Sequence, residues 1–131
     1  MVSVSTTKVY DLEERTAKFG EDIIAFCKIL PVNDITKRII PQLVACGTAI
    51  GANYCEADCA ESNKDFIHKM SIANKEAKES KHFIRMAAKV SPEHVSEARK
   101  LWKEAHELNL IFMTIVNKAK ETERRKNAES L

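Results

Sequence analysis

The sequence predicts an all-α protein, an antiparallel, up-and-down four-helix bundle. Apolar residues recur at alternating intervals of three and four through almost the whole chain, which is the spacing of one helix face. The repeat breaks only near Pro31, Ala60 and Ser91. The chain has 131 residues with only 3 glycines and 3 prolines, as expected for long helices joined by short loops. We therefore expect a single domain over 1–131, with its core at about 11–119 and loose termini at 1–10 and 120–131.

The first helix is predicted at 12–30. Asp11 followed three residues later by Glu14 predicts a capping box at its start. Pro31 predicts its end, because the residue before a proline disfavours the α conformation. Its core stripe consists of Leu12, Phe19, Ile23, Phe26 and Leu30.

The second helix should begin near Asn33 or Asp34, which are both good N-cap residues. Pro41 lies inside its pattern and predicts either a kink or the true first turn. Gly47 and Gly51 lie four apart on one face, so we expect another backbone, that of the third helix, to approach closely there. The alternative is that they only weaken the helix, by about 1 kcal/mol each. The core stripe is Ile39, Leu43, Cys46, Ile50 and Ala57, with Asn53 among them.

The third helix should start at Ser62, with Asp65 completing a second capping box. Small residues dominate the middle of its inner face, which predicts close packing. That face comprises Phe66, Met70, Ala73, Ala77, Ser80, Ile84 and Ala88.

The fourth helix should open at Ser91-Pro92-Glu93, an N-cap followed by proline at the first helical position. Its apolar face is wider than a two-helix seam needs. Part of it could therefore face another subunit or a partner helix, with Trp102 and Phe112 as anchors. The stripe contains Val95, Ala98, Trp102, Ala105, Asn109, Phe112, Val116 and Ala119, widened by Leu101, Leu108, Ile111 and Ile115.

Composition argues against several classes of protein. The chain has no run of 18 apolar residues and no signal-like N-terminal stretch, so we expect a cytoplasmic protein without membrane contact. Thiols stay reduced in that compartment. We therefore interpret the four cysteines, Cys27, Cys46, Cys55 and Cys59, as small buried residues.

The charge is uneven. Residues 1–60 hold 6 Lys/Arg against 8 Asp/Glu, and residues 61–131 hold 15 against 11. The overall charge of +2 does not by itself indicate a nucleic-acid binder. The third helix, however, carries a line of basic residues at alternating intervals of four and three, interrupted by one serine, Ser71. We call this line the basic stripe: Lys64, His68, Lys75, Lys78, His82, Arg85 and Lys89.

Cations about one helical turn apart can follow a phosphate backbone, so the basic stripe is the candidate nucleic-acid-binding surface. The alternative is a solvated face neutralised by Glu61, Asp65, Glu76 and Glu79. Few aromatic residues flank the stripe in sequence, which disfavours base stacking on single strands.

Residues 42–56 read Gln-Leu-Val-Ala-Cys-Gly-Thr-Ala-Ile-Gly-Ala-Asn-Tyr-Cys-Glu, and a capped helix with Asp65-Phe66 follows. This order resembles the four-helix-bundle proteins encoded in intervening sequences of bacterial 23S rRNA genes. More distantly, it resembles the accessory bundle proteins of diversity-generating retroelements. Val44 and Ala45 stand where the family pattern has two arginines, Gly51 replaces a proline and Ala57 a glycine. The matching positions are Gln42, Leu43, Ile50, Asn53, Glu56, Ser62, Asp65, Phe66 and Ala73.

The resemblance implies a closed bundle that assembles into a homo-oligomeric ring, commonly a pentamer. It implies no enzyme. We expect the polar motif residues Gln42, Asn53, Glu56 and Asp65 to be structural, with Asn53 and Glu56 as a buried pair that ties the second helix to the 59–63 turn. A small polar binding site is the alternative.

We expect no catalytic residues, no metal and no cofactor. A di-iron bundle needs two Glu-x-x-His motifs, and only Glu79 with His82 fits that pattern. Cys55 and Cys59 lack a second ligand pair at suitable spacing. The leading hypothesis is a non-enzymatic scaffold or adaptor that binds RNA or DNA electrostatically. The alternatives are a protein-binding module and an intervening-sequence product without an essential partner.

Overall fold

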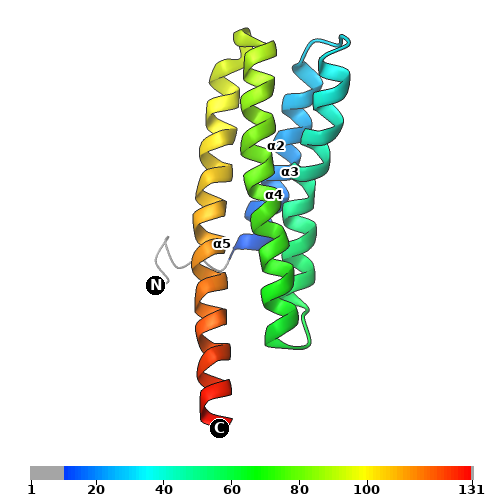
Figure 1. Cartoon of the computed structure of the whole chain (residues 1–131). Helices are drawn as coiled ribbons and strands as arrows, with labels where there is room; N and C mark the ends of the chain where they lie inside the picture. The colour runs from blue at the N-terminus through cyan, green and yellow to red at the C-terminus, as the bar shows by residue number, and fades with distance from the viewer. Residues whose placement is uncertain (1–10, 131) are drawn as a thin grey trace, which may run out of the picture.

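The computed structural model describes residues 11–130, and these form the predicted four-helix bundle without a strand among them. The helices are α2 (Leu12–Ile29), α3 (Thr36–Asp58), α4 (Asn63–Val90) and α5 (Val95–Ser130), with a 3-10 turn, η1 (Pro92–His94), before the last. Consecutive helices run antiparallel, up and down in turn (Figure 1). The expectation for residues 1–10 lies outside the described part.

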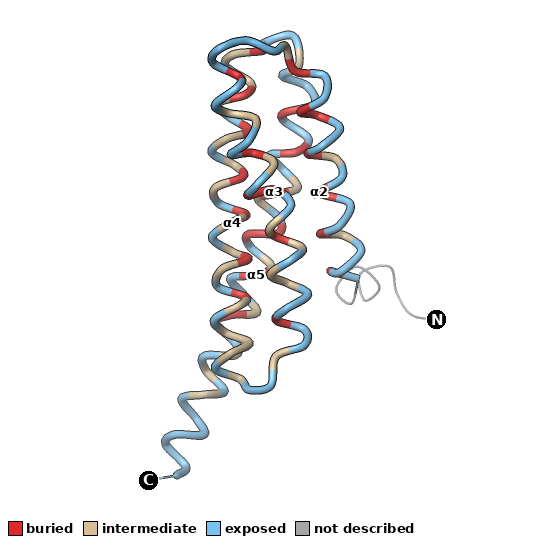
Figure 2. The backbone as a smooth tube through the Cα atoms, turned by 90° about the vertical axis from the view of Figure 1, so that its right-hand side faces the viewer, coloured by how far each residue is buried: buried red, intermediate tan, exposed pale blue. Residues whose placement is uncertain are grey.

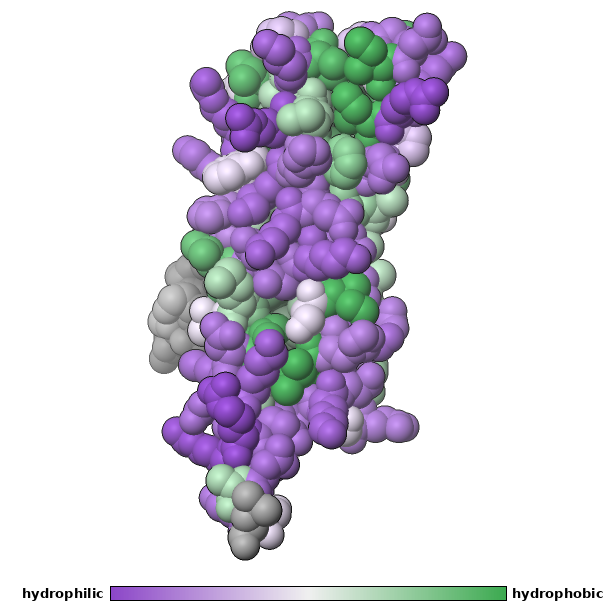
Figure 3. All heavy atoms as spheres, in the orientation of Figure 1, coloured by the Kyte–Doolittle hydropathy of each residue, from purple (hydrophilic) through white to green (hydrophobic). Residues whose placement is uncertain are grey.

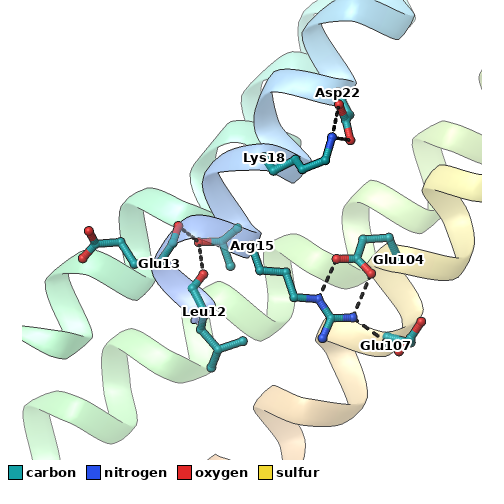
Figure 4. Close-up of polar contacts among 8 residues, drawn as sticks. Leu12, Glu13, Arg15, Lys18, Asp22, Glu104 and Glu107 are labelled. Carbon is teal, nitrogen blue, oxygen red and sulfur yellow. Dashed lines mark hydrogen bonds and ion pairs between the residues drawn. The ribbon is translucent and has the colours of Figure 1, made fainter. Parts of the chain in front are cut away.

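The predicted stripe of α2 is confirmed, because all five of its residues are buried in the core. The capping box is wrong, since the side chain of Asp11 accepts no capping hydrogen bond. In the first turns of α2, the buried Thr16 hydroxyl donates a hydrogen bond to the carbonyl of Leu12 at 2.7 Å (Figure 4). The buried residues of α2 belong to the core, which runs between the helices along the interior of the bundle (Figure 2).

The start of α3 lies two or three residues later than predicted. The side-chain oxygen of Asn33 accepts from the backbone N–H groups of Ile35 and Thr36 at 2.9 and 3.0 Å, so Asn33 still satisfies backbone donors at the start of the helix. Pro41 lies within the helix, after its first turn. Its place therefore excludes the prediction that it marks the first turn.

The two glycines of α3 face α2, and the prediction that they face the third helix is wrong. A methyl group added at Gly47 would lie 2.9 Å from side-chain carbons of Ile23. One added at Gly51 would lie 3.2 Å from the hydroxyl oxygen of Thr16. The close approach expected from the spacing exists, but a β-branched side chain of α2 fills the space above each glycine.

The remaining helix starts are largely as predicted. The hydroxyl of Ser62 accepts from the backbone N–H of Asp65 at 3.1 Å, which caps α4. Pro92 opens the η1 turn, and the Ser91 hydroxyl lies 2.7 Å from Nδ1 of His94. The inner face of α4 is buried except at its ends, where Phe66 is half-buried and Ala87 takes the buried place predicted for Ala88.

The segment from Lys120, which we expected to fray, continues α5 as helix to Ser130. It projects past the turn between α3 and α4 (Figures 1 and 2). The side-chain amide of Asn63 holds the start of this segment, because it donates to the carbonyl of Ala119 at 3.0 Å and to the carboxylate of Glu123 at 2.9 Å.

The α2 helix covers only part of the bundle's length (Figure 2). A double ion pair joins it to α5: the guanidinium of Arg15 donates to both carboxylate oxygens of Glu104, at 2.7 and 2.8 Å, and to Glu107 at 3.3 Å (Figure 4). The hydrogen bonds to Glu104 are the main reason why the pKa of Arg15 is raised. Charge-assisted bidentate pairs of this kind have a defined geometry, so this contact contributes to the orientation of α2 against α5.

Candidate nucleic-acid interface

All seven residues of the basic stripe are exposed. They follow the outer side of α4, because their spacing keeps them on one helix face opposite its buried stripe. Among the ion pairs of residues 11–130, only the one between Lys75 and Glu79 involves the stripe, and its 3.9 Å length with both side chains largely exposed makes it weak. The acids expected to neutralise the stripe thus leave most of its cations unpaired.

Hydrophilic residues cover most of the face that α4 and α5 present in Figure 3. Glu76, one of the acids named for neutralisation, is half-buried, and its pKa is raised chiefly by burial and then by Glu79. A carboxylate in that position lies to the side of the exposed stripe.

A polar cluster that our sequence reasoning missed joins α4 to α5. The ammonium of Lys81 donates to the side-chain oxygen of Asn109 at 3.1 Å and lies 3.1 Å from Nδ1 of His106. It also lies 5.3 Å from the centre of the Trp102 ring, which stacks on His106 with centroids 5.1 Å apart. Asn109 in turn donates to Asn74. The one signal in the sequence was Asn109 on an otherwise apolar stripe.

Trp102 therefore lies beside the basic stripe, although it comes 17 positions after Arg85 in the sequence. Both line a shallow groove of about 160 Å³ between α4 and α5. The groove has Arg99 as a second cation, and its remaining lining is apolar: Ile84, Ala88, Val95 and Ala98.

The polar family-motif residues are not gathered into one site. Asn53 is half-buried and donates to the carbonyl of Ala49 at 2.9 Å within its own helix. Glu56 is exposed and pairs with Lys69 of α4 at 2.7 Å, so the predicted buried pair with Asn53 is wrong. Gln42 is exposed, and Asp65 contributes its backbone to the cap of α4.

The positions of the two missing family arginines differ. Val44 is partly buried and packs against the core, whereas Ala45 is exposed. An apolar residue at 44 suits the packed position that it occupies.

The cysteines divide into two kinds. Cys27 and Cys46 are buried as predicted, but Cys55 and Cys59 are exposed, so the interpretation of all four as core residues is half wrong. Burial raises the pKa of the Cys27 thiol to about 11.

Within residues 11–130, no three His, Cys, Asp or Glu side chains lie together as a metal site would require. In the part of the chain that the structure describes, no helix combines the length and the hydropathy of a membrane-spanning segment.

This division predicts the outcome of a thiol titration. A disulfide reagent added to the native protein at neutral pH should modify Cys55 and Cys59 promptly and leave Cys27 and Cys46 unmodified, because burial denies access to the core pair and disfavours the reactive thiolate. All four should react in denaturant. A Cys55→Ser/Cys59→Ser variant is the control and should show no rapid phase. Prompt reaction of a third thiol in the folded protein would contradict the burial seen here.

Comparison with known proteins agrees with this architecture. A family model described as 23S rRNA-intervening sequence protein matches residues 8–114. A crystal structure of a protein with unknown function from the S23 ribosomal protein family of Bacteroides thetaiotaomicron is similar, with a TM-score of 0.74 and 27% sequence identity over 84% of this chain and 98% of that one. No curated protein matches the chain. The resemblance read from the sequence is thus confirmed, and the chain belongs to the 23S rRNA-intervening sequence protein family.

Proposed function

We propose that this protein is a non-enzymatic helical scaffold that assembles with copies of itself and binds nucleic acid, RNA or DNA, through the basic stripe. The observation that supports this most is the exposure of all seven stripe residues along a 28-residue helix, where only one weak ion pair with another residue of the range 11–130 involves them. Such a row suits a phosphate backbone, where released counterions drive binding.

Self-association would raise the affinity for a polyanion, which the small net charge of one chain keeps low. A chain of charge +2 binds polyanions weakly, but several stripes held in one ring act together and raise the effective concentration of each. Three large apolar side chains, Ile29, Val32 and Ile35, are 47%, 78% and 59% exposed around the α2–α3 connection. Exposed apolar groups gathered in this way are typical of association surfaces. They support a homo-oligomer, for which we propose the pentameric ring implied by the resemblance.

The test is a mobility-shift titration with structured RNA and duplex DNA at two salt concentrations, on protein whose mass is known from light scattering. The Lys75→Glu/Lys78→Glu/Arg85→Glu variant should bind at least about tenfold more weakly, and its affinity should depend less steeply on salt. A Lys118→Glu/Lys120→Glu/Lys126→Glu variant is the matched control. It changes net charge equally, at exposed residues of α5 that lie outside the stripe and outside the patch of Ile29, Val32 and Ile35.

Equal losses in both variants would mean that net charge alone matters and that the stripe is no interface. Absence of binding by the unchanged protein at low salt would contradict the nucleic-acid role and favour the protein-binding alternative, for which the patch of Ile29, Val32 and Ile35 is the observed candidate surface. A monomeric mass would contradict the ring.

A further inference from the structure

The α4–α5 groove differs in chemistry from two other hollows of the described bundle. The hollow between α2 and α5 includes Asp22 and Glu97, and the one between α2 and α3 includes Glu13 and Glu21. The α4–α5 groove has no acid in its lining and has two arginines, Arg85 and Arg99. Neither arginine forms an ion pair within residues 11–130. This groove therefore favours a ligand that carries negative charge.

Trp102 supplies a flat surface in the same groove. Its ring is stacked on His106, the residue one turn later, with an interplanar angle of 18°. Groove residues Ala98 and Arg99 come from the turn before Trp102, so the groove lies on the side of the ring away from His106. The side chain is 38% exposed, which leaves a large aromatic surface in contact with water.

The volume limits what can enter. About 160 Å³ is below the roughly 300–1,000 Å³ of a site that encloses a whole drug-sized ligand. It suits one flat ring placed against Trp102, with the rest of the ligand outside. A planar ring attached to anionic groups is the description of a nucleotide, and stacking on an aromatic residue requires a base that is not paired within a duplex.

We propose that an unpaired nucleotide of single-stranded nucleic acid places its base against Trp102, with its phosphates on Arg85 and Arg99. This inference rests on the proposed nucleic-acid function and specifies the ligand of the same surface. The stripe follows the backbone, and the groove selects strands that offer an unpaired base. The tertiary contact between α4 and α5 thus brings an aromatic residue beside a stripe that few aromatic residues flank in sequence.

Trp102 is the only tryptophan in the chain, so its fluorescence reports on this groove alone. A single-stranded uridine oligonucleotide should quench it saturably. A duplex with the same number of phosphates, and an abasic single strand of equal length, should both shift in a gel without comparable quenching.

Trp102→Leu should weaken single-strand binding about 5- to 150-fold, the range expected for loss of one stacked base, and leave duplex binding unchanged. Trp102→Phe should restore part of the affinity. Leu110→Ala, an exposed apolar residue of the same helix, is the control and should bind as the unchanged protein does.

The outcomes separate the two proposals. Equal affinity for all three ligands without quenching, or an unchanged affinity of Trp102→Leu, would overturn the groove while the stripe stands. Failure of every nucleic acid to bind at low salt would overturn both. Circular dichroism of each variant is the control for folding, and only variants with the helical spectrum of the unchanged protein are compared.

Discussion

Phe112→Ala is expected to destabilise the bundle by about 3–5 kcal/mol, the range for deleting a buried aromatic side chain. Phe112 is fully buried in the core, and its ring lies against Tyr54 of α3, with centroids 6.5 Å apart and planes 19° from parallel. The truncation would leave a cavity in the core beside the Tyr54 ring. Chemical denaturation followed by circular dichroism measures the loss, at one protein concentration because the self-association that we propose would make stability depend on concentration.

The neighbouring residue offers a matched control. Met113 is 41% exposed, and Met113→Ala should change stability by no more than about 0.5 kcal/mol. This pair also tests the idea that Phe112 anchors an external partner, which its burial contradicts. If Phe112→Ala kept its stability and lost only self-association, Phe112 would be a surface anchor after all.

Gly47→Ala is expected to destabilise the protein by about 1–2 kcal/mol, because the strain of overpacking exceeds the gain in helix propensity. The new methyl group would meet Cγ1 and Cγ2 of Ile23 at 2.9 Å and its Cβ at 3.2 Å. Ile23 is fully buried and β-branched, so it has little freedom to move away.

Gly20→Ala is the control for this substitution. Its added methyl would lie 3.5 Å from the nearest atom, Cα of Thr48, which is an ordinary contact. Stability should stay the same or rise by up to about 1 kcal/mol from helix propensity. Equal effects of the two substitutions in denaturation would show that helix propensity, rather than the contact with Ile23, determines the result.

The core was predictable because burial in a helical bundle repeats with the period of the helix. The stripe of α2 and most of the inner face of α4 are buried as their spacing required. Helix ends were less predictable, since a cap depends on local geometry: Ser62 caps its helix, whereas Asp11 has a favourable residue type and makes no capping bond.

Which helix meets which face could not be predicted from spacing. Gly47 has the same helical position whether α2 or α4 packs on it, and only the packed structure places Ile23 there. Cys55 and Cys59 were expected to be buried because reduced cysteine usually is, but both are exposed, Cys55 near the end of α3 and Cys59 directly after it.

The fold class, the family and the basic stripe were predictable from the sequence, because each depends on residues close together in the chain or on their helical period. The contacts between helices were not. Lys81, Trp102 and His106 form one cluster, and Arg85 shares a groove with Arg99, only because α4 and α5 lie side by side. Contacts between helices depend on rotation and register, and these are set by the packing of all the side chains together.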